Sequence, residues 1–400
     1  MVNVGVDLHK TQFTVCIRNR GGEEFQRYAT TDAGYAAFLK EMAKWQSNGQ
    51  KVRVGVESTG NTRYFKSQME KAGIQVVVTN TLKLKVVNES VKKTDKHDAA
   101  TIAEFLEKDM LPESQLCSRE SEQIRRLLKA RTTLVRTQVV IKNQIHALFN
   151  AEGVEDVKRG ELQSKRGRQR VLNTLDEWEN GLVVQPLFDT IENLEKDIKG
   201  IEEQLANLLK EDRMVQLLLT IPGCGPICAW TIRAYIDDIK RFSSAKKLAS
   251  FAGLAPWVQN SNEVVRHGRV TKRGPEELRT ALVQVVMGLR RMQSKLCDWR
   301  LMQWYEEIKG NKGSGKAIVA TARKLAVIIW HMLSDDVEFD VGQMLDRKLL
   351  KKARAMRGCV TKSLVNEALS LVPKNPTNAS PDNKPDTKLA LPEEKKRKVG

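Results

Sequence analysis

The chain has 400 residues, more than one hydrophobic core usually organises, so we expect two or three folded units. Apolar residues make up 41% of it, which is enough to build real cores. The net charge of +18 favours a polyanionic partner, and nucleic acid above all. Charge alone leaves open a basic structural protein that binds polyanions incidentally, as ribosomal proteins do.

No apolar run is long enough to cross a bilayer, so we expect neither secretion nor insertion into a membrane. The six cysteines lack the spacing of a disulfide framework or a zinc finger. We therefore expect reduced thiols in a cytosolic protein at all six positions: Cys16, Cys117, Cys224, Cys228, Cys297 and Cys359.

The N-terminal part is typical of a mixed sheet. Residues 2–9 and 13–19 are apolar runs rich in β-branched side chains and predict two strands, with a third at residues 25–30. The pattern then predicts a helix capped by Asp32, a strand, a helix, a strand and a helix, at residues 32–45, 52–57, 61–71, 75–80 and from about residue 95. This is the order of an RNase H-like fold, in which the opening strands form an antiparallel meander and the later ones join through helices.

The middle of the chain carries two heptad patterns, which predict a coiled coil or a helical hairpin. One includes Leu127, Leu134, Ile141 and Leu148, and the other runs in steps of four and three through residues 187–208. We expect pairing between subunits, because the second stretch is long and its other faces are strongly charged. The alternative is a helix pair packed inside one subunit. The basic residues 158–170 between the two stretches predict a loop or an RNA-facing insertion.

The C-terminal part is mainly helical by pattern. Residues 217–234 (LLLTIPGCGPICAWTIRA) predict a helix-hairpin-helix, whose turn at Gly223 and Gly225 would direct backbone N–H groups at a phosphate. A polar loop follows residues 251–256, and helices are expected at 275–291 and 316–333. After about Val372 the chain is rich in Pro, Asn, Asp and Lys, which predicts disorder.

Two predicted strands carry an acidic residue in nearly the same frame, VGVD at Asp7 and VGVE at Glu57. The two strands are neighbours in an RNase H-like sheet, so both carboxylates would emerge side by side. Asp95 and Asp98 lie three residues apart at a helix start, and hence on one face.

Four converging carboxylates repel one another unless divalent cations lie among them, and Mg²⁺ prefers carboxylate oxygens and water. We therefore predict a Mg²⁺ site of catalytic carboxylates formed by Asp7, Glu57, Asp95 and Asp98. The alternative makes Asp95 a helix N-cap and Asp98 a partner of the helix dipole, and leaves Asp7 and Glu57 as isolated charges.

Three further sequence features give only weak evidence of function. Residues 310–317 (GNKGSGKA) nearly form a Walker A loop, but Ala317 replaces the Mg²⁺-binding hydroxyl and a helix precedes them, so we expect a flexible basic loop and no ATPase. His97 lies one residue off the face of the two aspartates and is read as flanking. Trp257 is equally compatible with stacking on a base and with a place in a core.

The segments GVDLHK, VGVEST and KTDKHDA resemble the DEDD-type transposases of bacterial insertion sequences, the IS110 family, and the related Piv-like invertases. The segment that starts at Leu217 and runs through FAGLAPWVQNSN resembles that family's second conserved domain. The resemblance covers roughly residues 1–345.

The resemblance implies a recombinase guided by a structured bridge RNA, which pairs with donor and target DNA. It matches Asp7, Glu57, Asp95 and Asp98 to the DEDD residues and Ser261 to the nucleophile that forms a phosphoserine link. The family usually has Ser-Gly where this chain has Ser261 and Asn262, and Asn also tolerates a positive φ. Four cations follow and would neutralise the phosphate charge in the transition state: Arg266, Arg269, Lys272 and Arg273. Without the resemblance, Ser261 reads as a polar turn residue.

We expect four parts in the chain. Residues 1–117 would form an RNase H-like (RuvC-like) DEDD catalytic domain, and residues 118–213 a helical coiled-coil spacer with a basic insertion. Residues 214–345 would form a mainly helical serine transposase domain, and residues 346–400 a basic, largely disordered tail. The expected partners are donor and target DNA, a non-coding RNA and further copies of the chain, as a dimer that assembles into a tetramer, with no membrane. In this hypothesis each working site joins the carboxylates of one subunit to Ser261 of another, as the resemblance also implies.

Two rival functions stay open at this point. One is an RNase H-like nuclease or Holliday-junction resolvase without serine chemistry, and the other is a non-catalytic nucleic-acid scaffold. The expected location is the bacterial cytoplasm, with the nucleoid. Residues 395–399 (KKRKV) resemble a nuclear-import signal, and an engineered addition and a basic tail that binds nucleic acid are both compatible with them.

Overall fold

The computed structural model describes residues 1–19, 21–80, 83–84, 94–151, 153, 158, 160–173, 181–261, 264–292 and 299–340. The chain divides into two compact units, Met1–Cys117 and Ser118–Gly400. The further boundaries expected at residues 213 and 345 stay predictions. The expected tail, with its KKRKV segment, lies outside the described residues, as do Cys297 and Cys359; the other four cysteines are free thiols.

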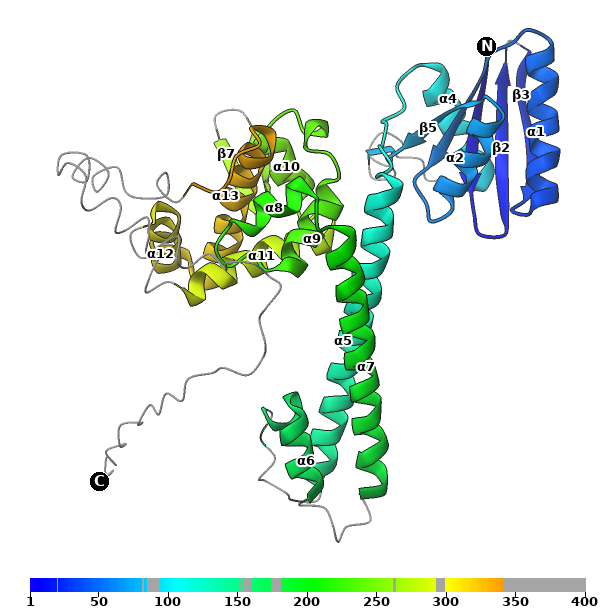
Figure 1. The fold of residues 1–400 in the computed structure, drawn as a ribbon. Coiled ribbons are helices and arrows are strands. Elements are labelled where there is room, and N and C mark those ends of the chain that lie inside the picture. Colours follow the sequence, from blue (N-terminus) through cyan, green and yellow to red (C-terminus); the bar gives the residue numbers. More distant parts are fainter. Residues whose placement is uncertain are drawn as a thin grey trace, which may run out of the picture. The chain divides into compact units, whose positions relative to one another are not determined.

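A five-stranded mixed sheet forms the centre of the first unit (Figure 1). Its strands are β1 (Val2–Leu8), β2 (Gln12–Asn19), β3 (Gly22–Ala29), β4 (Val52–Glu57) and β5 (Gln75–Thr79). They lie in the order β3-β2-β1-β4-β5; β1, β2 and β3 pair antiparallel, whereas β4 pairs parallel with both β1 and β5. The predicted order of strands and helices, with an antiparallel opening meander, is confirmed.

The two faces of this sheet are covered by different helices. Alternate residues such as Val4 and Val6 share one core with Phe38 of α1 (Asp32–Ser47) and Phe65 of α2 (Thr62–Lys71). Helix α4 (Asp95–Glu107) covers the other face. The predicted cap of α1 is wrong by one residue, because the side chain of Thr31, and not of Asp32, accepts the hydrogen bond from the backbone of the first turn.

Helix α4 approaches the sheet closely because the strands beneath it carry glycines. A Cβ at Gly5 would lie 2.0 Å from the Ala99 carbonyl oxygen and 2.4 Å from the Ala103 nitrogen, so only glycine fits there. At Gly55 a Cβ would lie 2.8 Å from a methyl group of Ile102. Gly5 therefore allows the backbone of α4 to pack directly on the backbone of β1, and Gly55 leaves room on β4 for the side chain of Ile102.

The second unit is mainly helical. Its helices are α5 (Arg119–Ala151), α6 (Lys165–Asn173), α7 (Gly181–Leu208), α8 (Arg213–Leu219), α9 (Pro226–Ile236), α10 (Ala245–Phe251), α11 (Glu276–Arg291), α12 (Arg300–Lys312) and α13 (Ser314–Ser334). Short 3₁₀ turns lie at Glu161–Gln163 and Ile239–Arg241. Helices α8 to α13 share one core, with Val285, Leu325 and Ile329 fully buried. The predicted helix-hairpin-helix is present as α8 and α9, and the two later predicted helices are present as α11 and α13.

The two heptad stretches form α5 and α7, which pack against each other within the chain (Figure 1). Ile141 and Ile145 of α5 share a buried cluster with Ile191 of α7. Arg131 donates a hydrogen bond across the pair to Glu202 at 2.6 Å. These seam side chains are covered inside the chain, so the structure has the helical hairpin that was the alternative, and pairing between subunits stays a prediction.

The predicted loop at residues 158–170 is wrong for its second half, which belongs to α6. Arg168 is only 2% exposed, and its guanidinium lies 2.9 Å from a carboxylate oxygen of Glu195 on α7. This arginine therefore ties α6 to the hairpin and is not available to RNA. A buried charge of this kind persists only when it is paired.

The predicted flexible loop at residues 310–317 is wrong as well. Gly313, with φ +83°, is the one residue between α12 and α13, and the segment before it is helical as expected. By length and composition alone, α13 is long and apolar enough to cross a membrane, which the sequence reading did not anticipate. Its Leu325, Ala326 and Ile329 are fully buried in the core of the second unit.

The close approach of α4 predicts that Gly5→Ala lowers the free energy of unfolding by about 1–3 kcal/mol, because the new methyl group meets backbone that cannot rotate away. Gly55→Ala should cost less, since its methyl group meets the flexible ends of Ile102 and Leu111. Gly200→Ala, on α7 with open space around it, is the matched control and should be neutral or stabilising by up to about 1 kcal/mol. Urea unfolding followed by circular dichroism measures all three; a Gly5→Ala protein as stable as wild type would contradict the packing argument.

Candidate active site

Three potential metal ligands meet at the end of β1. Asp7 is 7% exposed, and His9 Nε2 lies 3.0 Å from Asp7 Oδ2 and 3.7 Å from Asp95 Oδ1. One ligand atom from each of Asp7, His9 and Asp95 lies within 4.8 Å of the others, close enough to share a metal ion. His9 was not among the predicted site residues, although it lies in the segment GVDLHK. Its spacing of two residues from Asp7, on one face of an extended chain, is the signal that would have found it.

The carboxylates act on one another electrostatically. Burial raises the pKa of Asp7, the nearby His9 opposes this rise, and the negative charges of Asp95 and Asp98 add to it. Asp98 is therefore close enough to Asp7 to disfavour its charged form. A cation placed among these groups would reverse that penalty.

Helix α4 delivers both aspartates from its first turn, and neither of them caps it. The side chain of Thr94 is the cap, accepting a hydrogen bond from the His97 backbone, so the alternative reading of Asp95 as an N-cap is wrong. The Asp95 side chain is 39% exposed, and Arg27 of β3 lies 3.9 Å from it. This side of the site is thus open to solvent and has the positively charged side chain of Arg27 beside it. The Nε2 atom of His97 is buried and has no hydrogen-bond partner among the described residues.

Glu57 lies on the neighbouring strand. Val6 pairs with Val56 in the parallel register, so Asp7 and Glu57 follow side by side at the ends of β1 and β4. Glu57 is half-buried, and its carboxylate lies outside the close group of Asp7, His9 and Asp95. The structure therefore brings two of the four predicted carboxylates into one tight group, places Asp98 near them, and sets Glu57 beside them on the adjoining strand.

The residues present suit a divalent cation. Their donors are mainly carboxylate oxygens, which hard cations prefer, and the buried Asp7 would gain most from neutralisation. The openness at Asp95 leaves room for a phosphate to approach. The first unit can therefore supply a metal-dependent site for phosphoryl chemistry.

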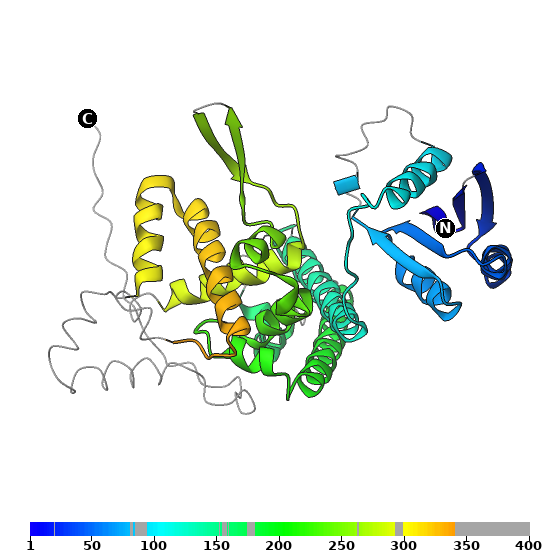
Figure 2. The ribbon, with the colours of Figure 1, turned by 90° about the horizontal axis from the view of Figure 1, so that it is seen from above.

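Ser261 lies in the second unit, at the far end of a hairpin. The predicted polar loop is in fact two antiparallel strands, β6 (Pro256–Ser261) and β7 (Val264–Val270), with a register shift between Pro256 and Val258. Figure 2 shows this hairpin projecting from the helices around it. Ser261 is the last residue of β6 and pairs with Val264, while Asn262 lies outside the described residues.

The predicted cations lie along and after the same hairpin. Arg266 is part of β7, and Arg269, Lys272 and Arg273 are exposed at its foot. Trp257 is 50% exposed, and a Cβ at Gly268 would lie 2.7 Å from its ring, so this indole packs on the hairpin rather than in a core.

The two predicted phosphate-binding glycines differ. Gly223, with φ +78°, packs against Gly288 of α11, where an added Cβ would lie 2.8 Å from the Leu289 nitrogen. Close helix packing therefore accounts for Gly223. Gly225 precedes the first turn of α9, is exposed and has open space around it, so its position remains compatible with an anion at the helix N-terminus.

Comparison with known proteins gives one consistent family. A transposase family model, that of the IS110-type DEDD transposases, matches residues 4–152, and the model described as "Transposase IS116/IS110/IS902 family" matches residues 215–298. The chain is 25% identical to a "Probable family 20 transposase" of Pseudomonas aeruginosa, over 85% of this chain and 98% of that protein. It is 28% identical to the "Transposase for insertion sequence element IS1111A" of Coxiella burnetii, over 85% and 91% of the two chains. It is also 26% identical to the "Pilin gene-inverting protein" of Moraxella lacunata, over 84% and 97%.

The two matched segments contain the two groups of predicted site residues. The first contains Asp7, Glu57, Asp95 and Asp98, and the second contains Ser261. Together they match more than half of the chain, and the relatives align over nearly their whole lengths. The chain therefore belongs to the IS110 family of transposases, enzymes of DNA transposition.

Proposed function

We propose that this transposase cuts and rejoins the DNA of an insertion sequence by combining a Mg²⁺-dependent carboxylate site in its first unit with the Ser261 hydroxyl in its second. The observation that carries this proposal is the gathering of Asp7, His9 and Asp95 at one open end of an RNase H-like sheet. Membership of a DEDD transposase family supports dependence on a divalent metal.

Asp7, Glu57, Asp95 and Asp98 would hold the cation. When bound, Mg²⁺ neutralises charge on the scissile phosphate and makes its phosphorus a better electrophile. His9 is half-exposed and hydrogen-bonded to Asp7, so it orients that carboxylate and can hold a proton at Nε2. Arg27, beside Asp95, offers a positive charge to the approaching DNA backbone.

The serine step exchanges one phosphoester bond for another. The Ser261 Oγ–P bond forms as the P–O3′ bond of the DNA strand breaks, and the 3′ oxygen leaves with a proton as a free 3′-hydroxyl. The number of phosphoester bonds is unchanged, so the reverse attack by a 3′-hydroxyl can join strands without ATP. Arg266, on β7 of the same hairpin, would stabilise the charge that develops on the phosphate at Ser261, while Arg269 and Lys272 at the foot of the hairpin would contact the DNA backbone farther along the strand.

We further propose that a structured bridge RNA selects the DNA, as the sequence resemblance implies. The net charge of +18 supports a large polyanionic partner, although it does not distinguish RNA from DNA. Sequencing the RNA that co-purifies with the protein from its native host tests this. One defined structured RNA is the expected result, and random fragments would contradict guidance by RNA.

We place the two halves of each working site in different copies of the chain within a homo-oligomer, a dimer that assembles into a tetramer. The carboxylates and Ser261 belong to separate compact units, which supports this arrangement. The α5–α7 seam gives it no support, because the chain fills that seam itself. A site shared between copies would make cutting depend on assembly.

Mixing variants tests both the chemistry and the sharing of the site. Asp98→Ala and Ser261→Ala should each abolish strand cleavage, whereas Glu70→Ala, an exposed acidic control on α2, should cleave normally. After subunit exchange, a mixture of the two inactive proteins should regain part of the cleavage, because some sites then combine an intact cluster with an intact serine.

If exchanged subunits stay as inactive as their components, the site is built within one chain. If Ser261→Ala alone cleaves like wild type, the nucleophile is water, and the protein works as a plain RNase H-like nuclease or resolvase.

A further inference from the structure

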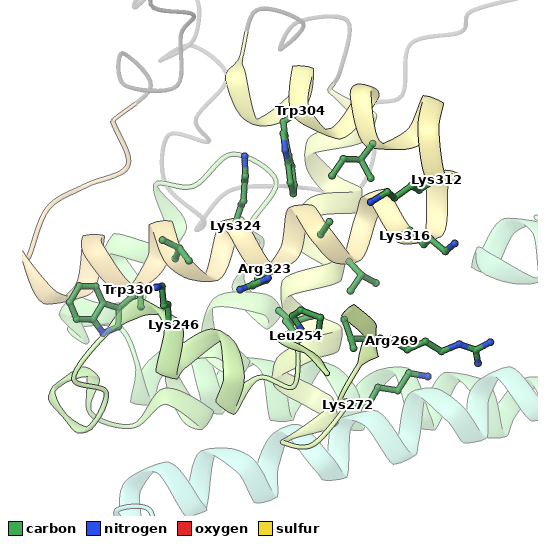
Figure 3. Close-up of a pocket in the computed structure, with 18 of the residues that line it drawn as sticks. Lys246, Leu254, Arg269, Lys272, Trp304, Lys312, Lys316, Arg323, Lys324 and Trp330 are labelled. Atoms are coloured by element: carbon green, nitrogen blue, oxygen red, sulfur yellow. The ribbon is translucent and has the colours of Figure 1, made fainter. Parts of the chain in front are cut away.

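A long groove lies at the foot of the β6–β7 hairpin, between α10, α12 and α13 (Figure 3). It encloses about 1520 Å³, more than the roughly 300–1,000 Å³ of a typical small-molecule site. Its volume therefore suits an extended ligand better than a free nucleotide or a phosphate ion.

The groove is lined by seven cations and, among the described residues, by no carboxylate. None of the seven forms an ion pair within the described part of the chain, whereas Lys309 on the same α12 pairs with Glu306. The cations come from four segments that the fold brings together: Lys246, Arg269, Lys272, Lys312, Lys316, Arg323 and Lys324. Figure 3 shows Arg269, Lys272, Lys312 and Lys316 gathered at one end. Like charges so close together repel, and a polyanion would neutralise them.

The interior of the groove is apolar and aromatic. Leu254, Ile308 and Val319 line it together with Trp304, and Lys324 Nζ lies 3.7 Å from the centre of the Trp304 ring. A cationic rim around an aromatic and apolar floor is the combination by which proteins hold single-stranded nucleic acid, with the phosphates on the cations and the bases on the rings. A double helix would keep its bases stacked inside and make no use of this floor.

The position of the groove indicates that the nucleic-acid strand it holds is DNA. Pro256, Gly268 and Arg269 line it and also form the foot of the hairpin whose far end carries Ser261. The five residue steps from Pro256 to Ser261 span about 17 Å at 3.3 Å per residue, which a few nucleotides of a DNA strand can cover. A strand held in the groove can thus continue along the hairpin to the serine, and the strand that the serine attacks is DNA.

We propose that this groove holds a single DNA strand a few nucleotides away from the phosphate that Ser261 attacks. The proposal rests on the proposed function and adds to it a separate binding site that works without the carboxylates. The segment GNKGSGKA, which resembles a phosphate-binding loop without its hydroxyl, supplies Lys312 and Lys316 to the rim.

Binding of labelled single-stranded DNA to the full-length Ser261→Ala protein, without Mg²⁺, tests the groove independently of cleavage. Lys312→Gln with Lys316→Gln should weaken binding at least about fivefold. The slope of log affinity against log salt, which is negative, should become less steep by about 1.4, which is 0.7 for each lost phosphate contact. The matched control, Lys199→Gln with Lys309→Gln, removes the same charge from α7 and α12 outside the groove and should change affinity less than about twofold.

A photocrosslinking oligonucleotide then locates the strand without relying on any folding-sensitive variant, and the expected crosslink falls on the peptide that contains Trp304. Three results would each overturn the proposal. The control pair could weaken DNA binding as much as the groove pair does, the crosslink could fall on another peptide, or the groove could bind the matching RNA or duplex DNA more tightly than the single strand. The groove variant could bind single-stranded DNA normally while Ser261→Ala fails to cleave. That result would contradict this inference alone and leave the proposed function intact.

Discussion

The contact between α4 and the glycines beneath it is the constraint on which the candidate active site depends. Gly5 lets the backbone of α4 rest on β1, where any larger residue would push it away, and Gly55 leaves room on β4 for the side chain of Ile102. Because side chains alternate along a strand, Asp7 and Glu57, two residues beyond these glycines, project on the face that α4 covers. The first turn of α4 brings Asp95 and Asp98 to the same place. The repeated sequence Gly-Val-acid therefore has two linked roles. The glycine lets α4 pack closely on the strand, and the acidic residue two positions later lies on the face that α4 covers.

This packing has an electrostatic cost. It holds Asp7 in a buried position near two further carboxylates, which raises its pKa and opposes folding at neutral pH. Such a cost is typical of functional sites, where charge is arranged for a ligand and not for stability. A divalent cation would convert the repulsion into binding energy, and the open side at Asp95 would then present it to DNA. The second unit has the opposite character, with cations around Ser261's hairpin and in the groove at its foot.

Local pattern predicted the strands and most helices, because runs such as VNVGVDL and VRVGVE carry a clear period. The heptads predicted the apolar seam of α5 and α7 but not their partner, since Ile141 and Ile191 would bury equally well in another copy of the chain. His9 was missed because one histidine carries no pattern, and the hairpin was missed because its strands, PWVQNS and VVRHGRV, do not alternate between apolar and polar residues. The groove lay beyond prediction, because its cations are scattered from Lys246 to Lys324 and only folding gathers them. Ser261 rests on the family resemblance alone.

The most direct measurement is the thermal stability of the wild type and of Asp7→Asn, with and without Mg²⁺, beside a Glu70→Gln control. Because the pKa of Asp7 is raised, wild-type stability should fall as pH rises through the range above the ordinary value of about 4, where the unfolded chain has already lost the proton. Without metal, Asp7→Asn should therefore be the more stable protein at neutral pH, with an advantage that disappears below about pH 4. Mg²⁺ should raise the melting temperature of wild type and of Glu70→Gln but not of Asp7→Asn. A metal-free Asp7→Asn protein that is less stable than wild type, together with no response of wild type to Mg²⁺, would contradict the account.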